Sequence, residues 1–147
     1  MTVAAIDFGR RIVGVAATDE LGLAAHPVGI VERVSLRKDI EAIRKLLSSH
    51  AVGRIIVGLP LNMDGSEGDS ARSARTFAEA IGTALGISVE LFDERLSTFE
   101  ARSRLKAKAS GRRSRRRVDA IAAAIILEGW MAANPRSVAG ARRVRMS

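Results

Sequence analysis

The hydrophobic residues of this chain gather in short runs separated by polar segments, and the short runs are typical of β-strands. Two of them, at 3–8 and 12–18, are joined by three residues, which is the spacing of a hairpin. A weaker run at 26–32 includes Pro27, and proline favours an edge strand because it cannot donate a ladder hydrogen bond. The continuous apolar run at 55–59 is typical of a parallel strand that is buried on both faces.

Longer segments with helical spacing predict helices at 35–49, 70–85, from Ser97 to about Gly111, and at 117–133. Ser35 suits the N-cap of the first of these. Gly86 suits the position just beyond the second, where the backbone is often left-handed. Residues 97–100 form a capping box at the start of the third. Apolar side chains nearly surround the fourth, which predicts that this helix is largely buried.

The order of these elements predicts an α/β fold. The first three strands can pair antiparallel, and the strands at 55–59 and 87–92 return after a helix as parallel neighbours through right-handed crossovers. This gives a mixed five-stranded sheet with helices on both faces. The length of 147 residues suits one domain, which we expect at 1–135, followed by a basic C-terminal tail at 136–147.

The positive charge of the chain is concentrated in one part of it. The formal net charge is +8, but 13 of the 24 basic residues lie at 102–117 and in the tail, so the remainder is net negative. An arginine-rich cluster of this kind attracts polyanions such as nucleic acids, although a solvated charge run is the plainer interpretation. Aromatic residues make up only 3% of the chain, which favours recognition of backbone and shape over base stacking.

Several classes of protein are disfavoured by what the sequence lacks. It has no cysteine, which excludes a disulfide framework and a thiolate metal site. No apolar run is long enough to span a bilayer, and the first residues lack the pattern of a signal peptide. We therefore expect a cytoplasmic protein with no membrane partner.

Acidic side chains stand where predicted strands end. Asp7 closes the first run, and Asp93 and Glu94 follow the last one. In an open α/β sheet the carboxyl ends of parallel strands meet at one edge, where ligands bind. Asp119, which we expect in the first turn of the last helix, reaches the same edge if that helix begins there. Because adjacent strand residues point to opposite faces, only one of Asp93 and Glu94 can point towards the other acids.

Each of these acids has an ordinary explanation when it is taken alone. Asp7 can cap the turn that follows it, and Asp93 can pair with Arg95. Asp119 complements a helix dipole. If the acids converge on one edge, these explanations are not enough, because like charges repel unless a cation lies between them. Carboxylate oxygens suit Mg²⁺ or Mn²⁺, and a pair of such ions can activate water for phosphodiester hydrolysis.

Other polar residues change this interpretation little. His26 and His50 lie outside the predicted strand ends, and Ser97 is used as a helix cap, so no histidine-based or serine-based site competes. The polar loop at 60–69 leaves the same edge of the sheet. Its Asn62 can bond a phosphate or position a carboxylate, or it can be an ordinary turn asparagine.

Four motifs stand in order along the chain: Asp7-Phe8-Gly9 with Ile12-Val13-Gly14-Val15-Ala16, Val57-Gly58-Leu59-Pro60-Leu61-Asn62-Met63-Asp64-Gly65-Ser66, Asp93-Glu94-Arg95-Leu96-Ser97-Thr98, and Val118-Asp119-Ala120 before Ala124-Ile125-Ile126-Leu127-Glu128. Together they resemble the YqgF/RuvX family of pre-16S rRNA nucleases over most of residues 3–130. The resemblance implies an RNase H-like fold, akin to the RuvC Holliday-junction resolvases. It also implies a divalent-metal nuclease that matures the 5′ end of 16S rRNA in ribosome biogenesis.

The resemblance also implies roles for individual residues. Asp7, Glu94 and Asp119 would be the catalytic and metal-binding acids, with Asp93 as a further metal neighbour and Mg²⁺ or Mn²⁺ as the cofactor. Where the family usually has a small hydroxyl residue this chain has Arg10, which either adds a phosphate contact or crowds the metal ions. The residues expected to contact nucleic acid are Arg10, Arg11, Asn62, Arg95, Arg112, Arg113, Arg115, Arg116 and Arg117.

The leading hypothesis is therefore a nuclease on structured RNA, with pre-16S rRNA and the pre-ribosome as partners. A second hypothesis is a resolvase of four-way DNA junctions, which needs two symmetric cuts and hence a homodimer. A third is a non-catalytic RNA-binding module for ribosome assembly, in which the acids hold a structural ion. Sugar-kinase and actin-type ATPases also begin with Asp-x-Gly, but they clamp nucleotide between two domains, and this chain has length for one.

Overall fold

The computed structural model describes residues 1–96 and 111–135, and in its last helix it describes side chains from Val118 onward. The strands are β1 (Thr2–Phe8), β2 (Ile12–Thr18), β3 (Ala25–Glu32), β4 (Val52–Leu59) and β5 (Ser88–Asp93). The helices are α1 (Leu36–Leu47), α2 (Asp69–Leu85), the short 3₁₀ turn η1 (Glu94–Leu96) and α4 (Gly111–Ala133). The third predicted helix, at 97–110, and the tail at 136–147 lie outside the described residues.

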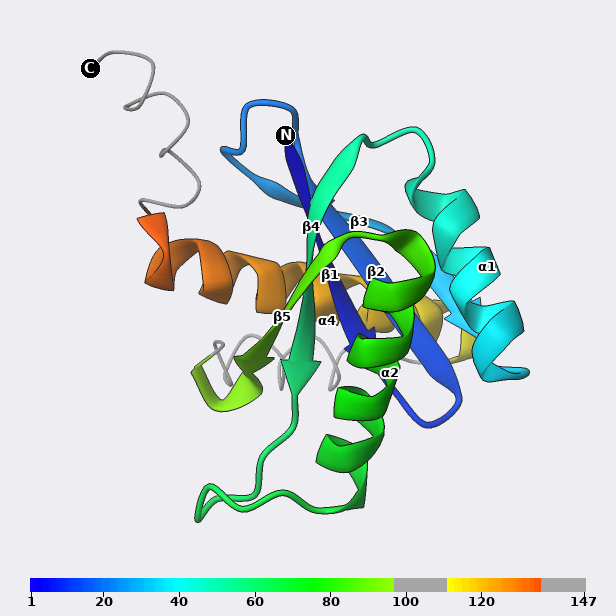
Figure 1. Ribbon diagram of the computed structural model, residues 1–147, viewed down its shortest axis with the longest axis vertical. Helices are drawn as coiled ribbons and strands as arrows, with labels where there is room; N and C mark the ends of the chain where they lie inside the picture. The colour runs from blue at the N-terminus through cyan, green and yellow to red at the C-terminus, as the bar shows by residue number, and fades with distance from the viewer. Residues whose placement is uncertain (97–110, 136–147) are drawn as a thin grey trace.

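The sheet has the predicted topology. Its strand order is β3-β2-β1-β4-β5, with β1, β2 and β3 paired antiparallel and with β4 parallel to both β1 and β5 (Figure 1). β3 lies at one edge, as the proline in it predicted. β1 and β4 lie inside the sheet, and the run Ile55–Leu59 of β4 is buried, as its continuous apolar character predicted.

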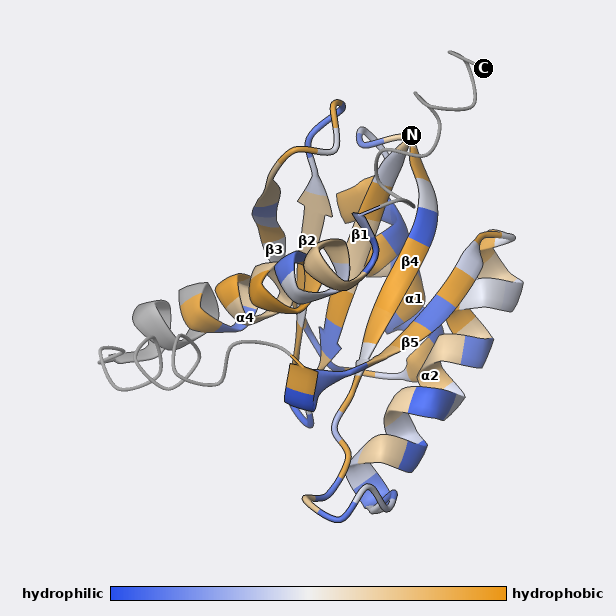
Figure 2. Ribbon diagram, turned by 90° about the vertical axis from the view of Figure 1, so that its left-hand side faces the viewer, coloured by the Kyte–Doolittle hydropathy of each residue, from blue (hydrophilic) through white to orange (hydrophobic). Residues whose placement is uncertain are grey.

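Helices cover both faces of the sheet, which confirms the predicted layers. α1 and α2 pack on one face and α4 on the other (Figure 1 and Figure 2). The buried side chains divide accordingly into two clusters. The first centres on Ile6, Val15, Ile55, Val57, Ile43, Phe77 and Ile81. The second centres on Ala5, Ala16, Ile56, Phe92, Ala123, Ile126, Leu127 and Trp130.

The α4 face of the sheet includes glycines and alanines beside the larger Ile56 and Phe92, and the helix approaches closely at the glycines. A Cβ atom placed on Gly14 of β2 would lie 2.8 Å from the carbonyl carbon of Asp119, and closer still to its oxygen. A Cβ atom placed on Gly58 of β4 would lie 2.8 Å from the Cδ1 atom of Ile126. A larger residue at position 14 would push α4 away from the strands, and one at position 58 would displace the side chains of Ile126 and Glu94.

The two predicted helix-end signals are present. Ser35 caps α1, because its side-chain oxygen accepts a hydrogen bond from the backbone N–H of Lys38 at 3.3 Å. Gly86 follows α2 with a positive φ of 64°, where glycine has no steric penalty. In both cases the local sequence was sufficient to predict the helix end, since the interaction spans only a few residues.

The predicted start of the last helix is wrong. α4 begins at Gly111, so residues 112–117 have a helical backbone and do not form an arginine-rich loop. Arginine is a good helix former, and no proline interrupts this stretch, so local propensity carries the helix further back. Asp119 consequently lies about two turns inside the helix, and its predicted place in the first turn is also wrong. None of the described helices is both long enough and apolar enough to cross a membrane.

Candidate active site

An open cleft of about 520 Å³ lies at the edge of the sheet where β1 and β5 end. Three acids that the sequence predicted for one edge, Asp7, Glu94 and Asp119, line it together. Each of the three is half-buried. The remaining lining residues are Phe8, Gly9, Arg10, Arg33, Pro60, Asp69, Ser70 and Ser73. The cleft therefore combines the three predicted carboxylates, from three separate elements, with a fourth acid, Asp69 of α2, and with two arginines at its rim.

Asp7 owes its direction to the register of the sheet. It is the second-last residue of β1 and pairs with Gly14 of β2. Residues that face each other across an antiparallel pair point to the same side of the sheet. Since α4 lies against Gly14, the Asp7 side chain points to the α4 side as well. The missing side chain at position 14 leaves room beside the carboxylate.

Glu94 is the first residue of η1, directly after β5. Along β5, Phe92 belongs to the cluster under α4, and alternation sends Asp93 to the opposite side and Glu94 back to the α4 side. A Cβ atom placed on Gly58 would lie 3.0 Å from the Cγ and Cδ atoms of Glu94, so this side chain lies directly over β4. Glu94 is thus the member of the Asp93–Glu94 pair that shares a side with Asp7.

Asp119 reaches the cleft through the packing of α4. Its backbone lies against Gly14, which is the register partner of Asp7. The two acids therefore approach the cleft from a strand and from a helix that meet at one glycine. This contact joins residues more than 100 positions apart in the sequence, so no local pattern could reveal it.

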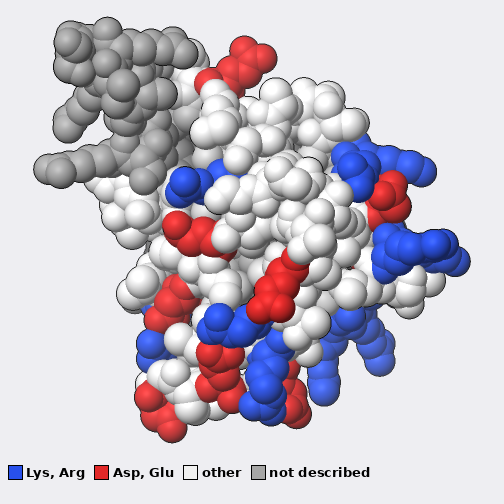
Figure 3. Space-filling model, in the orientation of Figure 1, with Lys and Arg blue, Asp and Glu red and all other residues white. Residues whose placement is uncertain are grey.

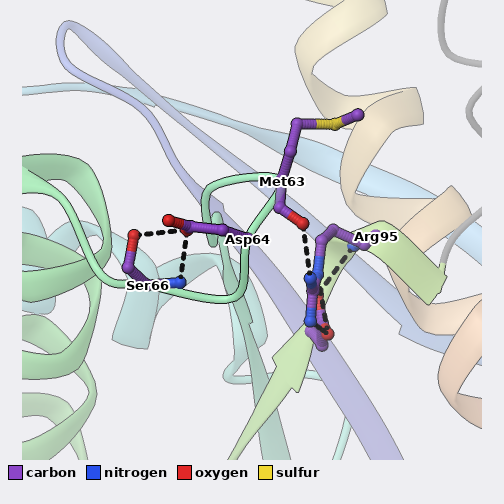
Figure 4. Close-up of polar contacts among 5 residues, drawn as sticks. Met63, Asp64, Ser66 and Arg95 are labelled. Atoms are coloured by element: carbon purple, nitrogen blue, oxygen red, sulfur yellow. Dashed lines mark hydrogen bonds and ion pairs between the residues drawn. The ribbon is translucent and has the colours of Figure 1, made fainter.

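Asp93 lies apart from the other three acids and does not line the cleft. It is held by Arg95, whose Nε donates to Asp93 Oδ1 at 3.0 Å and whose Nη2 donates to Oδ2 at 2.7 Å. The hydrogen bonds from the Arg95 side chain hold the pKa of the Asp93 carboxyl below its usual value. Arg95 Nη1 also donates to the carbonyl of Met63 at 3.3 Å, which ties β5 to the 60–68 loop (Figure 4).

Asn62 is used inside the same loop. Its Nδ2 donates to Ser66 Oγ at 2.9 Å, and the Ser66 hydroxyl donates to Asp64 Oδ1 at 2.6 Å. The Ser66 backbone N–H also donates to Asp64 Oδ1, at 2.9 Å, and these two bonds from Ser66, the hydroxyl one first, lower the pKa of Asp64 (Figure 4). Asn62 and Arg95, both expected to contact nucleic acid, therefore shape the loop and do not line the cleft.

The other expected nucleic-acid contacts fall in different places. Arg10 lines the cleft, in the turn between β1 and β2, and Arg11 beside it is exposed. The five arginines at 112–117 lie on the first two turns of α4, and their side chains are outside the described part of the chain.

The donor set of the cleft fits a hard divalent cation in its chemistry. All three acids offer carboxylate oxygens, which Mg²⁺ and Mn²⁺ prefer. As the side chains stand, however, no group of three His, Asp or Glu residues within 1–96 and 118–135 is arranged to hold a metal ion. Coordination by all three acids would therefore require them to move closer together within the cleft.

Sequence reasoning missed Arg33, which lies between β3 and α1. Its guanidinium carbon sits 4.3 Å from the centre of the Phe8 ring, and Nη1 donates to the carbonyls of Gly9 and Arg10 at 3.3 Å. Its Nε is 3.7 Å from Oδ2 of Asp39, which is 1% exposed. Asp39 is the signal in the sequence that could have pointed to Arg33. It lies in the first turn of an amphipathic helix, and a carboxylate that such a helix buries needs a partner.

The mixed sheet, the helix that crosses one face and the acidic cleft at the strand ends define an RNase H-like α/β domain. The chain belongs to the RuvX family, whose model, described as "Holliday junction resolvase", matches residues 1–133.

Relatives and solved structures agree with this assignment. A protein of Anaeromyxobacter sp. (strain Fw109-5), named "Putative pre-16S rRNA nuclease", is 52% identical over 127 residues, which cover 86% of this chain and 93% of the relative. A protein of the same name from Myxococcus xanthus (strain DK1622) is 45% identical over 135 residues, covering 91% and 89%. The RuvC structure described as "T. thermophilus RuvC in complex with Holliday junction substrate" superposes with a TM-score of 0.57 at 16% identity, covering 91% of this chain and 96% of RuvC. At that identity the likeness to RuvC concerns the fold alone, and it confirms the predicted fold class.

Proposed function

We propose that this protein is a nuclease that hydrolyses phosphodiester bonds of structured RNA, in the maturation of the 5′ end of pre-16S rRNA. The observation that carries the proposal is the presence of three carboxylates, from β1, η1 and α4, on one open cleft. Relatives named for pre-16S rRNA support this substrate, and membership of the RuvX family supports nuclease chemistry.

The proposal assigns metal binding to Asp7, Glu94 and Asp119. One or two Mg²⁺ or Mn²⁺ ions held there would activate water and stabilise the leaving oxygen. Asp7 is best suited to the central position, because the cleft is framed by Glu94 on one side and by Asp119 of α4 on the other. Asp93 is left out of the set, since it is bound to Arg95 and lies off the cleft.

The basic residues around the cleft would hold the phosphodiester backbone. Arg10 lines the cleft beside Asp7, so its guanidinium is placed to contact a phosphate that approaches the acids. The helical run of arginines at 112–117 lies on the same helix as Asp119, between it and the start of the helix.

The test is cleavage of an end-labelled precursor fragment that spans the 5′ end of 16S rRNA, with Mg²⁺ or Mn²⁺ present. We expect the Asp7→Asn and Glu94→Gln variants to lose at least about 100-fold in rate. The matched control is Asp93→Asn, the neighbouring acid that lies off the cleft, which should stay within about threefold of the unchanged protein. Equal rates for Asp7→Asn and the unchanged protein would refute the assignment of the site.

The same assay separates the alternatives. A four-way DNA junction in a parallel reaction should be cut poorly or not at all if RNA is the substrate. Efficient symmetric cutting of the junction, together with a homodimer in light scattering, would favour a resolvase. RNA binding that persists in a chelator, with no product under any condition, would favour a non-catalytic assembly role.

A further inference from the structure

A second hollow continues the acidic cleft away from the acids. Its volume is about 460 Å³, and it shares with the cleft the residues Phe8, Arg33, Asp69 and Ser73. Beyond these it is lined by Leu36 of α1 and by Arg72, Thr76 and Phe77 of α2. The two hollows thus form one path from the acids into the space between two helices. We call the part lined by these eight residues the α1–α2 groove.

The base of the groove is a stack of flat side chains. The Phe8 and Phe77 rings lie 4.3 Å apart between centres, with 17° between their planes. The Arg33 guanidinium lies over the Phe8 ring, with 4.3 Å from Cζ to the ring centre. A cation held on an aromatic face in this way is stabilised without being neutralised.

Arg33 is held in one orientation by its other contacts. Nη1 bonds two carbonyls of the β1–β2 turn, and Nε faces the buried Asp39. Within residues 1–96 and 118–135 no acceptor receives a hydrogen bond from Nη2 of Arg33, although the side chain lines both the cleft and the groove. At a fixed position, a guanidinium whose Nη2 donates to no acceptor within those residues is suited to a phosphate oxygen.

The charge of the groove changes along its length. The cleft end carries the three acids, whereas the groove holds one acid, Asp69, which is ion-paired with Arg72. The hydroxyl-bearing residues Ser73 and Thr76 are exposed on the α2 wall. Over α2, on the face shown in Figure 3, acidic and basic side chains alternate without a large patch of one sign. Any attraction for a polyanion here therefore comes from individual fixed groups such as Arg33.

We propose that the α1–α2 groove binds the nucleic-acid strand on one side of the scissile phosphate, with Arg33 as a fixed phosphate contact. The inference rests on the proposed nuclease function and extends it to the path of the substrate. A strand bound at the acids continues in some direction, and the groove is the hollow that is continuous with the cleft on this side. Its polar groups are the guanidinium groups of Arg33 and Arg72, the hydroxyls of Ser73 and Thr76, and the Asp69 carboxylate that is paired with Arg72. The guanidinium and hydroxyl donors suit a phosphodiester backbone better than a protein segment.

The first test introduces a negative charge on the groove wall. Thr76→Glu and Thr83→Glu place the same change on exposed positions of α2, seven residues apart, so both point to nearly the same side of the helix. Thr76 lines the groove and Thr83 does not. In an Asp7→Asn background with chelator, we expect Thr76→Glu to raise the Kd for the labelled precursor fragment about tenfold at low salt, and Thr83→Glu by less than about twofold. Equal Kd values for the two variants would overturn the proposal.

The second test locates the strand directly. Because the chain has no cysteine, Thr76→Cys and Thr83→Cys can each be labelled with a photoreactive aryl azide at a single site. We expect the labelled Thr76→Cys variant to crosslink nucleotides on one side of the cleavage position, and the labelled Thr83→Cys variant to give only background. Crosslinking no stronger from Thr76→Cys than from Thr83→Cys would contradict the groove as a binding path.

Both tests are independent of cleavage. If the unchanged protein cuts no RNA while Thr76→Glu still weakens binding, the nuclease function fails and the groove stands. If cleavage occurs but neither Thr76 variant differs from its Thr83 counterpart, only the groove fails. Thermal unfolding of each variant shows whether a loss of binding reflects loss of the fold.

Discussion

Gly14 of β2 lies directly beneath the backbone of Asp119 in α4, with no room for a side chain between them. Gly14 is also the register partner of Asp7. One small residue therefore sets the approach of two of the three acids in the cleft. The position of Asp119 depends on how closely α4 packs, and not on the sequence around Asp119.

We predict that Gly14→Ala destabilises the protein and impairs cleavage together. A Cβ atom would overlap the Asp119 carbonyl, so α4 must shift, at a cost of about 1–3 kcal/mol in the free energy of unfolding. Urea denaturation and the RNA cleavage assay measure the two effects. The control is Gly29→Ala in the adjacent β3, where a Cβ would meet only the Leu46 side chain at 3.3 Å. A stable and fully active Gly14→Ala protein would show that α4 does not set the site.

We predict that Gly58→Ala disturbs Glu94, the acid that lies over β4. Its Cβ would lie 3.0 Å from Glu94 Cγ and Cδ and 2.8 Å from Ile126 Cδ1, so the Glu94 side chain must rotate away from β4. We expect the cleavage rate to fall about tenfold or more, with a loss of about 1–3 kcal/mol in stability. Gly68→Ala, whose Cβ would have its nearest contact at 3.6 Å on Asn62, serves as the control. Activity that falls only in proportion to the folded fraction would count against a role for Glu94.

The buried Asp39 gives a prediction about stability. Its Oδ1 accepts a hydrogen bond from the Val34 N–H at 2.8 Å, and its Oδ2 faces Arg33. Asp39→Ala removes the acceptor of the Val34 N–H and the ion pair of Arg33, so we expect a loss of about 1–3 kcal/mol in the free energy of unfolding. Glu41→Ala on the same helix removes only an exposed pair with Arg44 and should cost less than about 1 kcal/mol. Equal losses in urea denaturation would mean that Asp39 does not anchor Arg33.

The Asp93–Arg95 pair predicts a dependence of stability on pH. Arg95 holds the pKa of Asp93 in the folded protein below its value of about 3.9 in an unfolded chain. The pair therefore stabilises the fold above pH about 4, and that stability is lost as the pH falls through the lower, folded pKa. At pH 7 the free energy of unfolding of Asp93→Asn should be lower than that of the unchanged protein, by no more than about 1 kcal/mol. This difference in stability should disappear in acid. A gap that stays constant from pH 7 to strong acid would contradict this account.

Much of the fold followed from patterns that span only a few residues. Ser35 and Gly86 mark helix ends because a cap and a left-handed glycine involve only their own neighbours. The apolar runs predicted the strands, and the helices between the later runs predicted parallel strands joined by right-handed crossovers. The predicted helix at 117–133 begins too late, because the arginines before it favour helix and extend α4 back to Gly111.

The candidate site was predictable in kind but not in detail. Asp7 and Glu94, at or directly after the ends of predicted strands, predicted an acidic edge of the sheet. The four sequence motifs indicated the family. The choice of Glu94 over Asp93, the internal use of Asn62 and Arg95, and the part played by Arg33 did not follow from spacing. Each depends on which face a side chain takes and on what lies opposite it in the folded chain.

From the sequence alone come the α/β class, the order of the strands and the presence of acids at their carboxyl ends. These follow from periodicity and chain connectivity, which are local or nearly so. Only the tertiary structure brings Asp119 of α4 onto Gly14 of β2, lays Glu94 over Gly58, and turns Arg33 onto Phe8. These contacts join distant parts of the chain, so they are decided by close packing, in which the absence of a side chain at one residue determines where another residue can lie.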